Sequence, residues 1–341
     1  MVQGNAIFRH SNASLLSVTE VLAPVTVTSA QIDEELAPVL KRLRLPKGLL
    51  PRVAGVTARR NWEHPGHFQE GAAEAGRRAL QQAGVQPGQI GLMVNTSVTR
   101  ETLEPSVAVR IHHEMGLPTS ATNFDITNAC LGFVNGMTLA SSMIDAGQID
   151  YAIVVAGEDS VKVQQATLEN LKAEDVDRAS FMEQFASLTL GSGAAAAVIG
   201  RTDRHPEGHR ILRGITRAGT DHHDLCVGDH KGMFTDSSAL LKDGLELVMD
   251  AWNEVPADWG WSSMDRYVTH QVSRLHTDSI TEAAGLDPAR FPVTYPELGN
   301  VGPASLPITL AREADRLSAG DKVLCMGVGS GLNTAMLELA W

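Results

Sequence analysis

The sequence predicts an α/β fold of five layers, αβαβα, built from two duplicated halves. Amphipathic helical segments alternate with short apolar runs along the chain, which is typical of strands covered by helices on both faces. One offset of 171 residues places Thr-Leu-Ala at 138–140 over Thr-Leu-Ala at 309–311. The same offset aligns Asp150 with Asp321, each of which precedes an apolar run. A repeat of about half the chain length indicates an internal duplication.

The first half, residues 1–200, predicts helices and strands in alternation. Period-3.6 patterning identifies the helices, and short continuous apolar runs identify the buried strands. Helices are expected at 31–45, 72–83 and 134–144, and strands at 90–95, 152–156 and 194–199. The charged segment 159–184 lies outside the repeat, so we expect it to form a helical cap inserted into this half.

The second half, residues 201–341, repeats the same order of elements. A helix is expected at 238–252, and strands at 265–270, 323–327 and 334–339. A glycine-rich turn around Asn300 then corresponds, one residue out of register, to the turn around Cys130. Since sites gather at the ends of strands in α/β sheets, the two turns and His270, at the end of a strand, are predicted to converge.

Composition limits the classes of function. The 341 residues carry a net charge of −12, which argues against a general nucleic-acid binder. Cys130, Cys226 and Cys325 are far apart and do not suggest a disulfide framework, so a reducing, cytoplasmic setting is expected. No window approaches the roughly 18 consecutive apolar residues of a membrane span, and no signal peptide is evident.

Cys130 is the candidate nucleophile. It lies between small residues directly before the helix predicted at 134–144. The positive end of a helix dipole lowers the pKa of a thiol there, and a thiolate attacks acyl groups. The alternative is a buried structural cysteine, for which this argument would not hold.

His270 and Asn300 complete a set of groups suited to thioester chemistry. A neutral imidazole and an amide can both donate hydrogen bonds to an oxygen that gains enolate charge. The glycines beside Asn300 permit a tight turn that directs its amide. No cofactor and no metal are expected for this chemistry.

These motifs resemble those of the thiolase superfamily, in particular ketoacyl-ACP synthase III. Residues 129–133 are similar to the family's Ala-Cys-x-Gly-Phe, and His270-Gln271 begins like its His-Gln-Ala-Asn. Gly299-Asn300 is similar to Gly-Asn-Thr-Ser, and 54–60 to Thr-Gly-Ile-x-x-Arg-Arg. The resemblance runs from about residue 50 to residue 341 in family order and implies a thiolase-like fold.

Departures from that pattern resemble the olefin-pathway branch (OleA), whose members join two fatty acyl-CoAs head to head. Val272-Ser273 and Gly302-Pro303 replace the usual residues, and 95–106 is similar to the same branch. The resemblance implies a homodimer that condenses long-chain acyl-CoAs to a 2-alkyl-3-ketoacyl product and supplies downstream pathway enzymes. It also implies that Glu104 reaches the partner subunit's site. A non-decarboxylating condensation needs a base for an α-proton, and Glu104, with its pKa raised by an apolar channel, is the candidate.

Two further groups of residues are candidates for binding. Gly-rich 327–332 is expected to offer an oxyanion hole, in which the Ser330 and Cys130 amides donate to an acyl oxygen. It superficially resembles a dinucleotide fingerprint, but too little chain follows it for a βαβ unit. Arg52, Arg59 and Arg60 are candidates for the CoA phosphates.

Several alternatives remain open at this point. The chain could be a ketoacyl-ACP synthase III that uses malonyl-ACP, a cysteine acyl-CoA thioesterase, or a non-catalytic acyl-CoA binder. Cys325 could be the second cysteine of degradative thiolases rather than a core residue. Residues 221–226 together with His230 could hold zinc, although their spacing matches no standard structural site.

Overall fold

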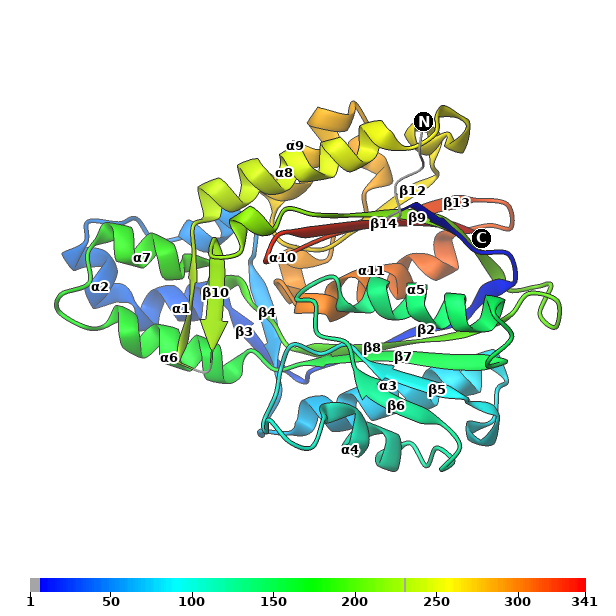
Figure 1. Ribbon diagram of the computed structural model, residues 1–341. Coiled ribbons are helices and arrows are strands. Elements are labelled where there is room, and N and C mark those ends of the chain that lie inside the picture. Colours follow the sequence, from blue (N-terminus) through cyan, green and yellow to red (C-terminus); the bar gives the residue numbers. More distant parts are fainter. Residues whose placement is uncertain (1–6, 230) are drawn as a thin grey trace.

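The computed structural model describes residues 7–229 and 231–341, and Figure 1 shows five layers. Helices α8 (Ser237–Glu254) and α9 (Arg274–Ala284) cover one outer face, and α3 (His67–Ala83) and α4 (Val107–Glu114) cover the other. Helices α5 (Gly132–Asp145) and α11 (Ser305–Glu313) lie between the two sheet layers. The predicted α/β class and its layering are therefore confirmed.

The strands of the first half form one sheet layer, in the order β6-β5-β7-β8-β2. They are β2 (Ala13–Leu22), β5 (Leu92–Asn95), β6 (Thr122–Asp125), β7 (Tyr151–Glu158) and β8 (Gly193–Arg201). All eight residues of β7 are buried, because helices cover both faces of the strand. Its apolar sequence is therefore what a central strand requires.

The second half repeats this order with one strand fewer, as β12-β13-β14-β9. They are β9 (His209–Ala218), β12 (Arg266–Thr269), β13 (Lys322–Gly329) and β14 (Asn333–Ala340), and β1 (Ile7–Arg9) pairs with β9. The strands β5-β7-β8-β2 of the first half match β12-β13-β14-β9 of the second. In each set the first strand is parallel to the second, and the remaining neighbours are antiparallel. This shared pairing supports the duplication inferred from the 171-residue offset. The two layers join where Ser14 and Leu15 of β2 pair with Arg210 and His209 of β9.

A separate group of elements lies to one side of the layered body, at the left of Figure 1. It contains α1 (Ser29–Glu35), α2 (Ala37–Arg42), α6 (Val161–Leu171), α7 (Arg178–Gln184) and the hairpin of β10 (Cys226–Asp229) and β11 (Gly232–Thr235). A second hairpin, β3 (Val25–Thr28) with β4 (Ala58–Asn61), connects this group to the body. Helices α6 and α7 occupy the segment in which a cap insertion was predicted.

The helix predicted at 31–45 is wrong as a single element. It is divided at Leu36 into α1 and α2, and Pro38 lies in the first turn of α2. A proline has no N–H for the preceding turn, so one continuous helix would lose a hydrogen bond there. The apolar faces of both helices still pack into one cluster, through Ile32, Val39 and Leu40.

None of the helices in the described residues is both long and apolar enough to cross a membrane.

Candidate active site

Cys130 lies in a strained turn between β6 and α5. Ala129 adopts φ 45°, a left-handed conformation that a residue with a Cβ rarely takes. Hydrogen bonds hold the turn on both sides, since Asn128 donates to Asn135 of α5 at 2.8 Å and accepts from Asn333 of β14 at 3.3 Å. The turn thus fixes Cys130 directly before the N-terminus of α5, as predicted.

His270 follows β12, and its backbone N–H donates to Met326 O at 2.8 Å. The next side chain, Gln271, is fully buried and accepts from Thr294 N at 2.7 Å, which ties this strand end to the segment before Asn300. The glutamine of the His-Gln pair therefore has a structural role. His270 Nδ1 is buried and has no hydrogen-bond partner among the described residues. Burial lowers the pKa of His270 to about 3, helped by the nearby His276, so the imidazole is neutral at pH 7.

Asn300 is held by its backbone and directed by its side chain. Its N–H donates to Thr189 O and its C=O accepts from Gly191 N, both at 2.9 Å. Its Oδ1 accepts from Gly302 N at 3.0 Å, so the amide NH₂ is the part of the side chain left to donate. This is the orientation that stabilisation of an oxyanion requires.

The contact between the Asn300 turn and the segment before β8 leaves no room for a Cβ. A Cβ on Gly191 would lie 2.0 Å from Leu298 O, and one on Gly299 would lie 2.3 Å from Thr189 O. We expect Gly191→Ala to destabilise the protein by about 3 kcal/mol, because backbone must move on both sides. Urea unfolding measures this, with Gly88→Ala, whose Cβ would meet nothing within 4 Å, as the control. Equal stability of the two variants would contradict this close packing.

The predicted residues meet at one cavity of about 610 Å³. Cys130, His270, Asn300 and Ser330 all line it, together with many apolar side chains from α8 and β11. A Cβ on Gly329, next to Ser330, would lie 3.4 Å from Ala129 Cβ, so the turn after β13 packs on the Cys130 turn. The structure therefore brings Cys130, Asn300 and Ser330, which lie in three separate turns, together with His270 at a strand end.

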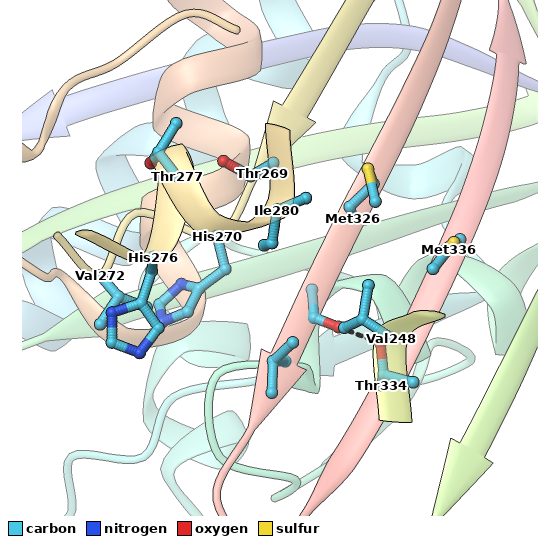
Figure 2. Close-up of a pocket in the computed structure, with 12 residues that line it drawn as sticks. Val248, Thr269, His270, Val272, His276, Thr277, Ile280, Met326, Thr334 and Met336 are labelled. Carbon is cyan, nitrogen blue, oxygen red and sulfur yellow. Dashed lines mark hydrogen bonds between the residues drawn. The ribbon is translucent and has the colours of Figure 1, made fainter. Parts of the chain in front are cut away.

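A smaller cavity of about 30 Å³ adjoins the large one and shares His270 and His276 with it. Figure 2 shows both imidazoles at one end of this cavity, with Met326 and Met336 toward the other. Burial lowers the pKa of His276 to about 4, so both rings are uncharged at pH 7. The lining is consequently suited to an apolar chain rather than to a charged group.

The prediction of a lowered thiol pKa for Cys130 is wrong. Burial raises the pKa of Cys130 to about 12, and the potentials of Cys226 and Glu158 add to this. Desolvation of the thiolate is the largest cause of this rise. The thiol is therefore neutral at pH 7 and must lose its proton as it attacks.

Glu158 is a cavity residue that sequence reasoning missed. It ends β7, is only 6% exposed, and burial raises its pKa to about 7 against hydrogen bonds from Thr99 and Val98. A Cβ on Gly302 would lie 3.4 Å from Glu158 Cγ, so its side chain also faces the Asn300 turn. Its position directly after seven apolar residues could have identified it from the sequence, because functional sites in α/β sheets gather at the ends of strands.

Glu104 is exposed and does not line this cavity in the chain that the structure describes. The apolar channel expected around its carboxylate is therefore not formed by its own chain. Its neighbour Leu103 is 95% exposed, although it is a large apolar residue. Glu104 is thus the one predicted catalytic residue that the single chain leaves apart from Cys130.

Arg59 is not available for the phosphates of CoA. It is fully buried and donates to Leu188 O at 2.9 Å and to Ser29 Oγ at 3.2 Å, and burial lowers its pKa to about 10. Its guanidinium joins the start of α1 to the segment before β8. Arg52 is exposed and Arg60 is half-buried, and neither lines the large cavity in the described residues.

The remaining candidates have simpler structural roles. Cys325 is fully buried in β13, and burial raises its pKa to about 12, as for a core thiol. His230 lies outside the described residues, while His222 Nδ1 lies 3.2 Å from Asp243. Cys226 lines the large cavity, which the sequence did not indicate.

The buried His270 predicts a loss of stability in acid. Its folded pKa, about 3, lies below the ordinary 6.5, so the stability that it contributes is complete above pH 6.5 and is lost as the pH falls. Between pH 7 and pH 5 we expect the wild type to lose about 2 kcal/mol more unfolding free energy than His270→Asn. Urea unfolding at both pH values measures the difference, and equal losses in the two proteins would contradict a neutral buried imidazole.

Comparison with known families gives consistent matches over both halves. The model of 3-oxoacyl-[acyl-carrier-protein] synthase III matches residues 124–218, and the model of its C-terminal part matches residues 256–341. These ranges contain Cys130, His270, Asn300 and Ser330.

Individual proteins are similar over nearly the whole chain. The acyl-CoA:acyl-CoA alkyltransferase of Xanthomonas campestris is 40% identical over 334 residues, which cover 97% of this chain and 99% of that protein. The protein of the same name from Shewanella oneidensis is 33% identical, covering 98% and 100%. The structure of a cysteine-to-serine variant of Xanthomonas campestris OleA with bound lauric acid and lauroyl-CoA has a TM-score of 0.94 and 40% identity, covering 97% and 100%.

Proposed function

The chain belongs to the family of the acyl-CoA:acyl-CoA alkyltransferases, and on that basis we propose that it condenses two long-chain fatty acyl-CoAs without decarboxylation. The observation that carries this proposal is a large, mainly apolar cavity that contains a nucleophile and two oxyanion donors. Such a cavity suits long alkyl chains attached to a reacting thioester.

Acylation of Cys130 is the first step. The Cys130 sulfur attacks the thioester carbonyl of the first acyl-CoA, the bond to the CoA sulfur breaks, and the thiol proton leaves with CoA. The amides of Cys130 and Ser330 donate to the oxygen that becomes negative in the tetrahedral intermediate. The result is an acyl thioester on Cys130 and free CoA.

Condensation is the second step and uses a residue from another chain. Glu104 of the partner subunit removes an α-proton from the second acyl-CoA, and the enolate carbon attacks the acyl carbonyl on Cys130. Neutral His270 and the NH₂ of Asn300 donate to the enolate oxygen. The carbon–sulfur bond to Cys130 breaks, the Cys130 sulfur takes up a proton to replace the one that Glu104 now holds and can release, and the product is a 2-alkyl-3-ketoacyl-CoA or, after hydrolysis, its acid.

The place of Glu104 supports a homodimer. A base for this step must approach the acyl-CoA in the cavity, yet Glu104 is exposed and does not line the cavity of its own chain, as far as the structure describes it, although its neighbour Leu103 does. Burial of an exposed leucine in a second copy is favourable and would also give Glu104 its apolar surroundings. The active form is accordingly a dimer in which each chain contributes Glu104 to the partner's site.

The wider assignments follow from the same proposal. The halves 1–200 and 201–341 are the two thiolase units, and the enzyme works in the cytoplasm, where its product passes to downstream enzymes of head-to-head hydrocarbon synthesis. Exposed Arg52 and Arg60 remain the candidates for contacts with the CoA phosphates.

The decisive experiment supplies a long-chain acyl-CoA as the only substrate. A condensed ketone or 3-ketoacid formed without any malonyl donor supports the proposal. A strict need for malonyl-ACP would instead indicate a ketoacyl-ACP synthase III, and free fatty acid with no new carbon–carbon bond would indicate a thioesterase. If neither acylation of Cys130 nor a product is detected, the chain would be a non-catalytic acyl-CoA binder.

A further inference from the structure

In the chain that the structure describes, the loop that carries Glu104 is hydrogen-bonded to the body only at its two ends, although Glu101 and Leu103 line the large cavity. Among the described residues, Glu101 to Pro105 make no hydrogen bond, and all five are exposed. The hydrogen bonds that fix where the loop leaves the body therefore help to set the direction in which Glu104 points. Two buried carboxylates, Glu158 and Asp125, accept these hydrogen bonds.

Glu158 holds the start of the loop. Its Oε1 accepts from Val98 N at 2.8 Å, and its Oε2 accepts from Thr99 N at 3.1 Å and Thr99 Oγ1 at 2.6 Å. Thr99 Oγ1 in turn accepts from Asp159 N at 3.0 Å. Three hydrogen bonds from two successive residues fix both oxygens of one buried carboxyl, so the attachment constrains the backbone at Val98 and Thr99.

Asp125 holds the other end of the loop and, through Arg100, also contacts its start. Its carboxylate accepts from Val107 N at 3.1 Å and Ala108 N at 2.9 Å, the first N–H groups of α4, and from Arg100 Nη1 at 2.8 Å. These contacts are those of a helix N-terminus and one ion pair, which explain Asp125 without reference to catalysis. The three bonds to Glu158 have no such explanation, because Val98 and Thr99 begin no helix or strand.

We propose that Glu158 is a positioning residue for condensation, which aims Glu104 at the partner subunit's site by fixing Val98 and Thr99. This inference rests on the proposed role of Glu104 in the partner's site. Glu104 is five positions after Thr99, so the base lies up to roughly 17 Å from its anchor. A rotation of roughly 10° at the anchor moves it by about 2–3 Å, and displacements of about 1 Å already slow proton transfer.

Mixed dimers test this role, because in them the loop that supplies Glu104 and the cavity that contains Cys130 belong to two different chains, each of which can be mutated separately. One chain, the donor, carries Cys130→Ala and serves only to supply Glu104, while the other, the acceptor, keeps Cys130. The two chains carry different tags, so that only mixed dimers are purified. The rate of condensation from a long-chain acyl-CoA is measured together with the acylation of Cys130 by intact mass.

Glu158→Gln in the donor chain should lower condensation about tenfold and leave acylation of the acceptor chain unchanged. The same substitution in the acceptor chain should cost several-fold less, because there it disturbs a loop that faces the inactive site. Equal losses in both placements, or a larger loss in the acceptor, would overturn the proposal and indicate that Glu158 acts in its own cavity.

Two variants of Thr99 keep the test valid should Glu158→Gln fail to fold. Thr99→Val in the donor removes the shortest of the three bonds and should lower condensation several-fold, whereas Thr99→Ser keeps the hydroxyl and should restore most of the rate. An unaltered rate with Thr99→Val would count against the proposal. Glu104→Ala in the donor is the reference: if it has no effect, the role of Glu104 in the partner's site is wrong, whatever Glu158 does.

Discussion

Replacing Glu104 by alanine should lower condensation about 10³-fold and leave acylation of Cys130 intact. The first step needs only the cavity of one chain, in which Glu104 has no part. The second step needs a base for an α-proton, and a positioned general base contributes roughly 10²–10⁴ in rate. The variant should therefore accumulate acyl-enzyme, seen as a mass shift of one acyl group per chain, while the ketone product disappears.

The control for this variant must change the same loop without removing the base. Thr102→Ala is suitable, because Thr102 is exposed two residues before Glu104 and does not line the cavity in the described residues. It should condense acyl-CoA at close to the wild-type rate. Loss of acylation in Glu104→Ala would show that the residue acts in the first step and would contradict its role as base.

Replacing Cys130 by alanine should abolish both steps. Without the sulfur no acyl-enzyme forms, and removal of a nucleophile typically lowers turnover by about 10⁴-fold or more. Intact mass after incubation with acyl-CoA should show one added acyl group per wild-type chain and none in the variant.

Cys325→Ala is the matched control, because it removes a thiol that is buried in β13 and outside the cavity. It should remain acylated at Cys130. Acyl transfer to a chain that lacks Cys130 would identify another nucleophile, and Cys226, which also lines the cavity, would be the first to examine.

The sequence predicted the parts of this protein that depend on local patterns. Buried strands such as β7 appear as continuous apolar runs, and the 171-residue repeat predicted two halves with the same strand order. Cys130, His270 and Asn300 were found because each lies in a short motif at the end of an element. Their convergence on one cavity then follows from the duplication.

What the sequence did not predict depends on burial after folding. Arg59 looks like a surface cation, but three hydrogen bonds inside the protein hold it where no phosphate can reach it. The thiol pKa of Cys130 was expected to fall because a helix begins beside it, whereas desolvation raises it. The contacts of Glu158 could not be predicted, because its hydrogen-bond partners Val98 and Thr99 lie some 60 residues earlier in the sequence.

The repeated strand order of the two halves has a consequence for how this enzyme can vary. The halves share one backbone plan, but the turn after β6 carries the thiol, and its counterpart in the other half carries the amide of Asn300. Each half therefore supplies a different component of one reaction centre, so a shift of either turn alters the spacing between the thiol and the amide.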